Sequence, residues 1–315
     1  MKKKIAILIG GESVERNISI KSGENFYRNL DTQKYSGYLI LLKKNEWNLI
    51  NTKEYKKIDE KNFSFIENGQ KITFDAVIIL IHGKPGETGE LCSYFESLEI
   101  PYNSTNEKAS KLTFNKKKCN DFLRTKGFTV PYSIMNKKSD PNIKYPCIIK
   151  PINSGSSFGV SKIELASNLN TAIKLAKEYS NDFMIEEFIE GRELTCAVHN
   201  FSNNKVYALP ITEIISKNQI FDYKAKYLGQ SKEITPAKID KKLENEIKNT
   251  SKKAYKMLEL NGVVRFDFII KKRIPYIIEV NTIPGFSKES ILPKMIEEDG
   301  TSVKDFISEA IEKII

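Results

Sequence analysis

Few residues in this chain are of the kinds that build zinc sites or disulfide frameworks. The 315 residues include four cysteines and two histidines, and no two cysteines form a CxxC pair. A Cys/His zinc site is therefore excluded by both number and spacing. We expect free thiols, buried or half-buried in a reducing compartment, at all four cysteines: Cys92, Cys119, Cys147 and Cys196.

Long hydrophobic runs are also missing. A run such as Ala76–Ile81 is far shorter than the roughly 20 residues that a membrane-spanning helix needs. Near the start, three lysines precede only five apolar residues before Gly10 and Gly11, and no small-residue cleavage site of a secretory signal follows. The sequence therefore predicts a cytoplasmic protein without a membrane partner.

Arginine is scarce although the formal net charge is +10. Only six of the 50 basic residues are arginine, the side chain that most often reads base edges in nucleic acids. The lysines are spread between acidic residues, which is typical of a solvated surface. We therefore expect no nucleic-acid partner. A non-catalytic nucleotide-sensing or nucleic-acid-binding protein stays as the alternative from another class.

What is present is the pattern of an α/β (α+β) protein. An apolar run over 4–9 ends at a glycine pair and leads into helix-compatible sequence, which is the opening of an open α/β sheet. Residues 216–236 lack a clear period and are expected to form a long loop. The further elements predicted are strands at 37–42 and 74–81 and helices at 105–126, 168–179, 240–259 and 303–315.

Two neighbouring predicted strands carry the sharpest chemical signal. The runs 263–270 and 276–280 are joined by five residues, which favours an antiparallel hairpin. Acid and amide oxygens on one face of such a hairpin suit Mg²⁺, which also takes substrate phosphates. The alternative is the salt-bridged polar face of an ordinary hairpin. Because residues two apart share a face of a strand, the polar pairs are Arg265 with Asp267 and Glu279 with Asn281.

Three other segments have a candidate chemistry and a plainer alternative. The glycine- and serine-rich segment 153–159, just after Lys150, can present N–H groups and hydroxyls to phosphate, or is a flexible hairpin turn. It is neither a Walker A loop nor GxGxxG. Segment 281–290, with Gly285, can offer N–H groups to an oxyanion, or is a strand-to-helix connection with a serine N-cap. The aromatic segment 221–227 is a lid, or a disordered connector.

These segments belong to a longer ordered series that covers nearly the whole chain. Its motifs are Gly10-Gly11-x-Ser13-x-Glu15-Arg16, His82-Gly83-x-x-Gly86-Glu87-x-Gly89, Phe114-Asn115-Lys116, Ile149-Lys150-Pro151-x-x-x-Gly155-Ser156-Ser157-x-Gly159, Glu186-Glu187-Phe188-Ile189-x-Gly191-x-Glu193, Asp222-Tyr223-x-Ala225-Lys226-Tyr227, Arg265-x-Asp267 and Glu279-x-Asn281-Thr282-x-Pro284-Gly285. The series resembles the D-alanine–D-alanine ligase family of ATP-grasp enzymes.

The resemblance implies a three-domain ATP-grasp architecture. An N-terminal α/β substrate-binding domain is expected at 1–104, a central subdomain with the phosphate loop at 105–186, and a C-terminal subdomain with the metal site and lid loop at 187–315. The implied reaction is ATP-dependent: one D-alanine becomes an acyl phosphate and a second attacks it, giving D-alanyl-D-alanine for peptidoglycan. ATP, two Mg²⁺ ions replaceable by Mn²⁺, and a homodimer are implied as well.

The resemblance also implies roles for individual residues. The metal ligands would be Asp267, Glu279 and Asn281. The ATP-binding residues would be Lys116, Lys150, Ser156, Ser157, Glu186, Glu187, Ile189, Glu193 and Lys226. The residues acting on the reacting groups would be Glu15, Ser156, Tyr227, Arg265 and Gly285, and those binding substrate would be His82, Lys226, Ser290 and Ile291.

The segment after Gly285 departs from the family pattern. It has Phe-Ser-Lys-Glu-Ser-Ile where the family more often shows Met-Thr and then Ser-Leu. Lys288 and Ile291 can reshape the subsite of the second amino acid, so ligation of D-alanine to D-serine stays as the alternative function. Tyr227 resembles the dipeptide-forming ligases, because relatives that use D-lactate carry histidine there.

Overall fold

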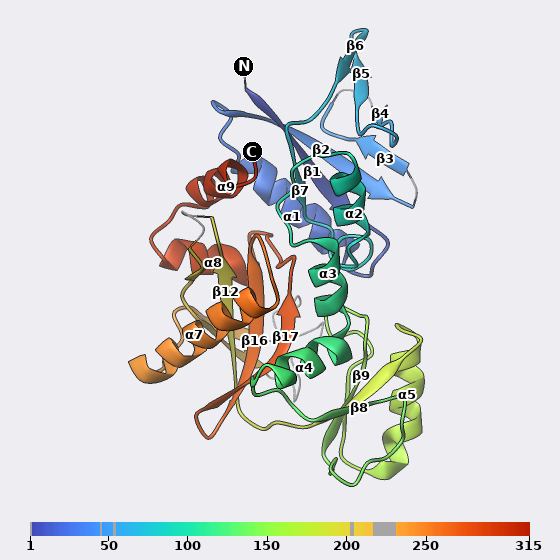
Figure 1. The fold of residues 1–315 in the computed structure, drawn as a ribbon, viewed down its shortest axis with the longest axis vertical. Helices are drawn as coiled ribbons and strands as arrows, with labels where there is room; N and C mark the ends of the chain where they lie inside the picture. Colours follow the sequence, from blue (N-terminus) through green and yellow to red (C-terminus); the bar gives the residue numbers. More distant parts are fainter. Residues whose placement is uncertain (1, 45, 53–54, 202–204, 217–230) are drawn as a thin grey trace.

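The computed structural model describes residues 2–44, 46–52, 55–201, 205–216 and 231–315. Three main sheets follow one another along the long axis of the molecule, with the N-terminal sheet at one end and the sheet that contains β8 and β9 at the other (Figure 1). Within those described ranges, no helix has the length and apolar character to cross a membrane.

The first sheet is built around a strand that is buried from Ile5 onward. Ile5–Ile9 has no exposed surface, because β1 pairs in parallel with β2 on one side and β7 on the other and is covered on both faces. Helix α1 (Arg16–Arg28) covers one face and α2 (Glu90–Ser97) lies on the other. The sheet order is β4-β3-β2-β1-β7, with strands β1 Lys3–Gly10, β2 Tyr35–Lys43, β3 Glu46–Leu49, β4 Lys56–Lys57 and β7 Ala76–Ile79; a separate pair is β5 Phe65–Glu67 with β6 Gln70–Ile72.

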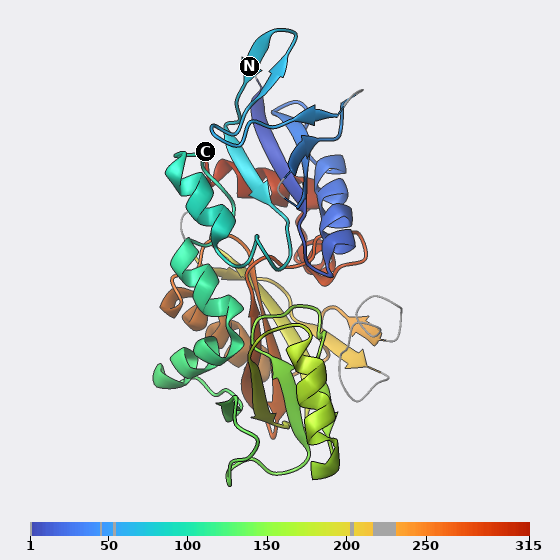
Figure 2. The same cartoon turned by 90° about the vertical axis from the view of Figure 1, so that its right-hand side faces the viewer.

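The C-terminal helices complete the core of this first sheet. Helices α8 (Ile291–Glu298) and α9 (Val303–Glu312) share one hydrophobic cluster with β1 and α1. In both ribbon views the red C-terminal helices lie beside the blue N-terminal sheet (Figures 1 and 2). The rings of Phe26 and Phe286 are 5.7 Å apart in this cluster. The last part of the chain therefore packs on the first part.

The second sheet has the order β10-β9-β11-β8 and is entirely antiparallel. The single helix expected at 105–126 is two helices, α3 (Glu107–Phe114) and α4 (Lys116–Thr125). The chain leaves helical geometry at Asn115, with φ −83° and ψ 95°, and the Asn115 side chain caps α4 by accepting from the Lys118 N–H. The strands are β8 Ser133–Met135, β9 Cys147–Pro151, β10 Ser161–Ile163 and β11 Phe183–Glu187, with η1 Ala166–Asn168 and α5 Leu169–Lys177 beside them.

The third sheet contains the predicted polar hairpin. Its order is β15-β14-β12-β16-β17, with β13 on β12, and one face is covered by α7 (Lys241–Met257). Leu243, Ile247 and Tyr255 of α7 are buried at helical spacing against it. The strands are β12 Arg192–His199, β13 Tyr207–Ala208, β14 Thr212–Ser216, β15 Ser231–Ile234, β16 Val264–Lys271 and β17 Ile274–Asn281.

The prediction of a long loop at 216–236 is wrong at the C-terminal end of that range. Residues 231–234 form β15, which pairs with β14 at the edge of the third sheet. The strand is short, and its sequence, Ser-Lys-Glu-Ile, has too few apolar residues for hydrophobic alternation to reveal it. The remainder, 217–230, lies outside the described residues, and with it lie two predicted site residues, Lys226 and Tyr227.

Candidate active site

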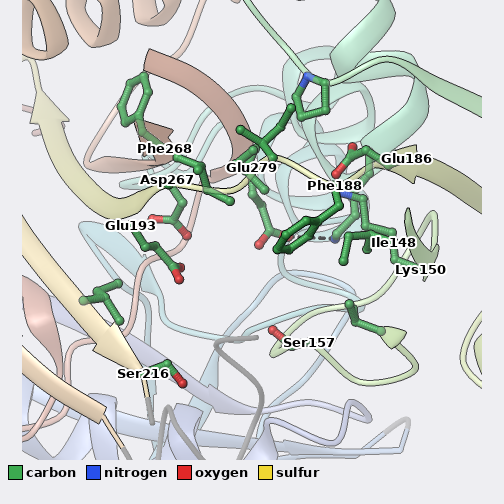
Figure 3. Close-up of a pocket in the computed structure, with 18 of the residues that line it drawn as sticks. Ile148, Lys150, Ser157, Glu186, Phe188, Glu193, Ser216, Asp267, Phe268 and Glu279 are labelled. Atoms are coloured by element: carbon green, nitrogen blue, oxygen red, sulfur yellow. Dashed lines mark hydrogen bonds and ion pairs between the residues drawn. The ribbon is translucent and has the colours of Figure 1, made fainter. Parts of the chain in front are cut away.

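A cavity of about 540 Å³ lies where the second and third sheets face each other. It is lined by Lys150 and Glu186 from the second sheet, by Asp267 and Glu279 from the third, and by Lys116 at the start of α4. The serine-rich segment also contributes to its wall. In Figure 3, Asp267 and Glu193 lie on one side of the cavity and Lys150 and Glu186 on the other, with Phe188 between them.

The predicted polar hairpin exists, and its two polar pairs are aligned. Asp267 is the direct cross-strand partner of Glu279, and Arg265 is the partner of Asn281. A β-bulge follows, because Phe268 pairs with Ile277 and leaves Ile278 as an extra residue in β17. Because of this extra residue, two consecutive side chains of β17, Ile278 and Glu279, both line the cavity, whereas Ile277 and Val280 pack in the core with α7.

Asp267 is 7% exposed, and its carboxylate accepts four hydrogen bonds from protein groups. Arg265 donates twice, at 2.8 Å to each oxygen, and Asn281 donates to Oδ2 at 3.0 Å. The Thr195 hydroxyl, on the neighbouring strand β12, donates to Oδ1 at 2.6 Å. A buried carboxylate requires such compensation, and the donors fix its orientation toward the cavity side of β16.

The donor set at this end of the cavity fits a hard divalent cation. Two carboxylates and one side-chain amide supply oxygen ligands of the kind that Mg²⁺ takes together with water and phosphate. Among the residues that the structure describes, no cluster of three His, Cys, Asp or Glu side chains is placed to hold a metal. A set of three protein ligands at this hairpin would therefore include the Asn281 amide oxygen, as the family resemblance implies, and that ligand set stays a prediction.

Lys116 joins the helix α4 to this polar hairpin. Its Nζ lies 2.8 Å from Oε1 of Glu279 and also donates to the Ser154 carbonyl in the serine-rich segment. Burial lowers the pKa of Lys116, but the carboxylates of Glu279, Glu87 and Glu15 together outweigh burial and raise that pKa above its ordinary value. Lys116 is therefore a permanent positive charge beside the candidate metal ligands.

A second buried ion pair occupies the opposite wall. Lys150 on β9 and Glu186 on β11 approach to 2.8 Å, with side chains only 6% and 4% exposed. Asn120 on α4 donates to the second oxygen of Glu186 at 3.1 Å. Burial raises the pKa of Glu186, although Lys150 opposes that shift. The anionic partner that a buried lysine needs is thus supplied by the protein itself.

The cavity also has an apolar wall that the sequence analysis did not identify. Its members are partly exposed side chains from β9, β16 and β17, from the position just before β10 and from the segment after β11. Lys162 lies 4.4 Å from the centre of the Phe188 ring, on the edge of this wall. Such a surface fits a flat aromatic base. The residues are Ile148, Val160, Phe188, Ile269 and Ile278.

Several predicted nucleotide-binding residues line the same cavity. Ile189 is buried, and Glu193 at the start of β12 reaches the side that carries Asp267. The Glu187 side chain accepts from the Tyr132 N–H at 2.8 Å, so its carboxylate holds β11 to the chain before β8. The predicted members that line the cavity are Lys116, Lys150, Ser157, Glu186, Glu187, Ile189, Glu193, Asp267 and Glu279.

The turn after β1 meets the serine-rich segment. Ser156 donates its hydroxyl hydrogen to Glu15, and both side chains are 7% exposed. A Cβ atom added to Gly155 would lie 2.0 Å from Oε2 of Glu15, so only glycine permits this approach. Ser156 and Ser157 both have positive φ, 46° and 58°, a backbone conformation that turns the segment sharply here. The contact places the first sheet against the cavity.

His82 and Glu87 flank this contact from the loop after β7. The His82 side chain is buried, and within the described part of the chain its Nε2 has no hydrogen-bond partner. Burial lowers the pKa of His82, while the nearby Glu15 carboxylate opposes that shift. Glu87 accepts from the Gly83 N–H at 2.8 Å, and burial together with Glu15 raises the pKa of Glu87 to about 7. An unpartnered buried imidazole nitrogen is free to meet a polar ligand.

Gly285 and Ser290 lie on the turn between β17 and α8. Ser290 occupies the N-cap position of α8, but its hydroxyl makes no capping bond and instead contacts Ser287 at 3.0 Å. The segment is therefore the strand-to-helix connection of the plainer alternative, and the binding of an oxyanion by its N–H groups stays a prediction. Ile291 is 6% exposed in the core shared with the first sheet.

The structure groups the predicted residues into two connected sets. The described predicted residues that do not line the cavity are Glu15, His82, Ser156, Arg265, Asn281, Gly285, Ser290 and Ile291. Arg265 joins the two sets through Asp267, and Ser156 joins them through the serine-rich segment.

Two antiparallel sheets that face each other across a cavity, with the buried Lys150 on one wall and an acid–amide hairpin on the other, fit the ATP-grasp architecture that the sequence resemblance implies. Residues 4–105 match the family described as D-ala D-ala ligase N-terminus, and residues 116–312 match the one described as D-ala D-ala ligase C-terminus. The chain belongs to the D-alanine–D-alanine ligase family.

Similar proteins agree with this assignment over their full length. The chain is 40% identical to a D-alanine–D-alanine ligase of Flavobacterium johnsoniae, with 98% of each chain covered. It is 38% identical to one of Phocaeicola vulgatus, with 99% of each covered. Among solved structures, the VanG D-Ala:D-Ser ligase of Enterococcus faecalis has a TM-score of 0.88 at 29% identity, with both chains fully covered. A Bacillus anthracis D-alanine–D-alanine ligase complexed with ATP has a TM-score of 0.77 at 26% identity, covering 99% and 96%.

Proposed function

We propose that this enzyme joins two D-alanine molecules to D-alanyl-D-alanine, with ATP converted to ADP and phosphate. The carboxylate of the first D-alanine takes the γ-phosphoryl group, and the amine of the second attacks the resulting acyl phosphate. The observation that carries the proposal is the alignment of Asp267 with Glu279 across the cavity from Lys150 and beside Lys116. Phosphoryl transfer depends mainly on such positioning and charge neutralisation.

The polar hairpin is the proposed metal-binding element. Asp267, Glu279 and Asn281 would hold two Mg²⁺ ions, or Mn²⁺ in their place. These ions would neutralise charge on the β- and γ-phosphates. Lys116, already fixed beside Glu279, would contribute a permanent positive charge to the same phosphates. Ser157 and the neighbouring N–H groups of the serine-rich segment would enclose the phosphate end of the nucleotide.

The opposite wall of the cavity is the proposed site of adenine and ribose. Glu186 would accept from the base, the backbone of Glu187–Ile189 would follow its edge, and Glu193 would bind the ribose. The half-buried apolar side chains between them suit the faces of a purine. Lys150 compensates the Glu186 charge and would also reach a phosphate oxygen.

The contact between Glu15 and Ser156 is the proposed site of the first D-alanine. Glu15 would orient its ammonium group, and the unpartnered Nε2 of His82 would lie near its carboxylate. Arg265 and the Gly285 N–H would stabilise the oxyanion that forms when the second amine attacks.

Ser290, with Ile291 beside it, would bind the carboxylate of the second D-alanine. Lys226 and Tyr227 would complete the phosphate and first-substrate sites from segment 217–230. Two properties of the whole enzyme are proposed as well: it acts as a homodimer, and it works in the cytoplasm on a precursor of peptidoglycan.

The decisive experiment measures ADP release from MgATP with D-alanine, D-serine or both, and identifies the products by mass. We expect ADP release with D-alanine alone, and D-alanyl-D-alanine as the main product of the mixture. Predominant D-alanyl-D-serine would replace the proposed acceptor, and no ADP release with either amino acid would refute the proposed reaction.

A further inference from the structure

Asn120 is a buried amide that contacts one wall of the cavity. It lies in the middle of α4 and is 3% exposed. Its Nδ2 donates to Oε2 of Glu186 at 3.1 Å, although the two residues are 66 positions apart in the chain. The N-terminus of α4 is already capped by Asn115, so the helix itself does not require this amide.

One face of α4 reaches both walls of the cavity. Lys116 and Asn120 are four residues apart, and this spacing places them on the same face of a helix. Lys116 contacts Glu279 on the third sheet, and Asn120 contacts Glu186 on the second. Rotation or displacement of α4 would therefore alter both carboxylates together.

The two donors on Glu186 determine what else it can bind. Lys150 donates to Oε1 at 2.8 Å and Asn120 to Oε2 at 3.1 Å. A carboxylate oxygen has about two acceptor sites, so each oxygen still accepts one more hydrogen bond. The exocyclic amine of adenine is a donor and satisfies such an acceptor. The O6 of hypoxanthine is an acceptor, and it would leave two acceptors facing each other in a buried site.

We propose that Asn120 is a positioning residue that keeps Glu186 an acceptor for the exocyclic amine of the base, and thereby selects adenine over hypoxanthine nucleotides. The inference rests on the proposed function, because it requires a nucleotide in this cavity. Burial favours the protonated form of Glu186, and Glu279 on β17 adds like-charge repulsion, whereas Lys150 and Asn120 oppose protonation. Loss of the amide would weaken that opposition and allow Glu186 to become a donor.

The first test is Asn120→Asp, measured as binding of ADP and of IDP in the presence of Mg²⁺ without D-alanine, by calorimetry. The substitution keeps the side-chain shape but sets two carboxyl groups against each other, so they share a proton. We expect ADP affinity to fall about tenfold, the range of a lost hydrogen bond to a charged group. The ratio of ADP to IDP affinity should shrink, and it should recover as the pH rises from 6 to 9 and the shared proton is lost.

A matched control is Asn136→Asp. The Asn136 amide also donates to a carboxylate, Asp182, at 2.6 Å, but on an exposed turn away from the cavity. This variant should keep the wild-type ratio of ADP to IDP affinity at every pH. A changed ratio in the control would show that added negative charge alone alters base preference, and that result would overturn the inference.

Asn120→Leu is the second variant, because it removes the donor without adding an acid. ADP affinity should fall more than IDP affinity, with thermal unfolding confirming a folded protein. If both Asn120 variants bind ADP and IDP in the wild-type ratio, Asn120 is only structural and the inference fails while the proposed function stands. If wild-type protein binds neither nucleotide, the proposed function fails and the inference fails with it.

Discussion

Lys150→Met tests the energetic role of the buried ion pair. Lys150 and Glu186 are 6% and 4% exposed and 2.8 Å apart. Removing one partner of a buried pair leaves an uncompensated charge, which typically lowers the free energy of unfolding by about 3–5 kcal/mol. We expect a loss in this range at pH 8, measured by urea unfolding. Far-UV circular dichroism is the suitable signal, because the single tryptophan, Trp47, lies in the separate core of the first sheet.

The loss should depend on pH in a defined direction. Burial holds the pKa of Glu186 above its ordinary value of 4.5, and Lys150 is the main group that opposes this. Without Lys150 the folded state retains a proton that the unfolded state has released. The free energy of unfolding of the variant should therefore fall as the pH rises from about 5 to 8, relative to wild type. At pH 5, where the unfolded state is also partly protonated, the loss should be smaller.

Two comparisons separate ion-pair loss from loss of packing. The double variant with Lys150→Met and Glu186→Leu removes both charges, and much of the lost stability should return. Lys241→Met removes an exposed lysine that pairs with Glu244, and it should leave the unfolding midpoint nearly unchanged. A Lys150→Met variant as stable as wild type at pH 8, or a double variant less stable than the single one, would refute this account.

Three further predictions concern the two ends of the site. Asp267→Asn should raise the Mg²⁺ concentration for half-maximal ADP release about tenfold, because it removes ligand charge; unchanged metal dependence would contradict the assigned role. Gly155→Ala should raise the KM for D-alanine strongly, because its Cβ would lie 2.0 Å from Oε2 of Glu15; a wild-type KM would show that the segment shifts freely. Glu87→Gln should gain stability over wild type as the pH rises from 5 to 8, because the wild-type carboxyl has a pKa of about 7 when folded and must ionise while buried. Urea unfolding at both pH values tests it, and a pH-independent difference would argue against that pKa.

Much of the polar site could be predicted because its signals are local. Two apolar strands with a short connector favour an antiparallel hairpin, and period two places Arg265 with Asp267 and Glu279 with Asn281. The five-residue connector predicted between them is wrong, because the strands extend to Lys271 and from Ile274 and leave a turn of two residues. The serine-rich segment is similarly local, although residue type does not predict the positive φ that Ser156 and Ser157 adopt there. The bulge that brings Ile278 into the cavity beside Glu279 has no marker residue such as glycine, so it could not be predicted.

Partners far apart in the chain were not predictable in the same way. Lys150 ends an otherwise apolar strand, but periodicity could not tell that Glu186, 36 positions further along the chain, is its partner. Asn120 carries no motif, and only the packing of α4 against β11 reveals its contact. The apolar wall around Phe188 likewise combines side chains from separate strands, each of which reads as ordinary strand or turn sequence.

The sequence by itself determined the α/β class, the polar hairpin and the ordered motifs, because these depend on residue type and short spacing. Tertiary structure decided how the pieces meet. Helices α8 and α9, at the end of the chain, complete the core of the first sheet, and Glu15 reaches Ser156 across the boundary between sheets. These elements meet because each one alone leaves apolar area exposed to water, which packing against another element buries. Short spacing in the sequence cannot tell which of several distant apolar surfaces will cover a given element, so the partners are decided only when the whole chain packs.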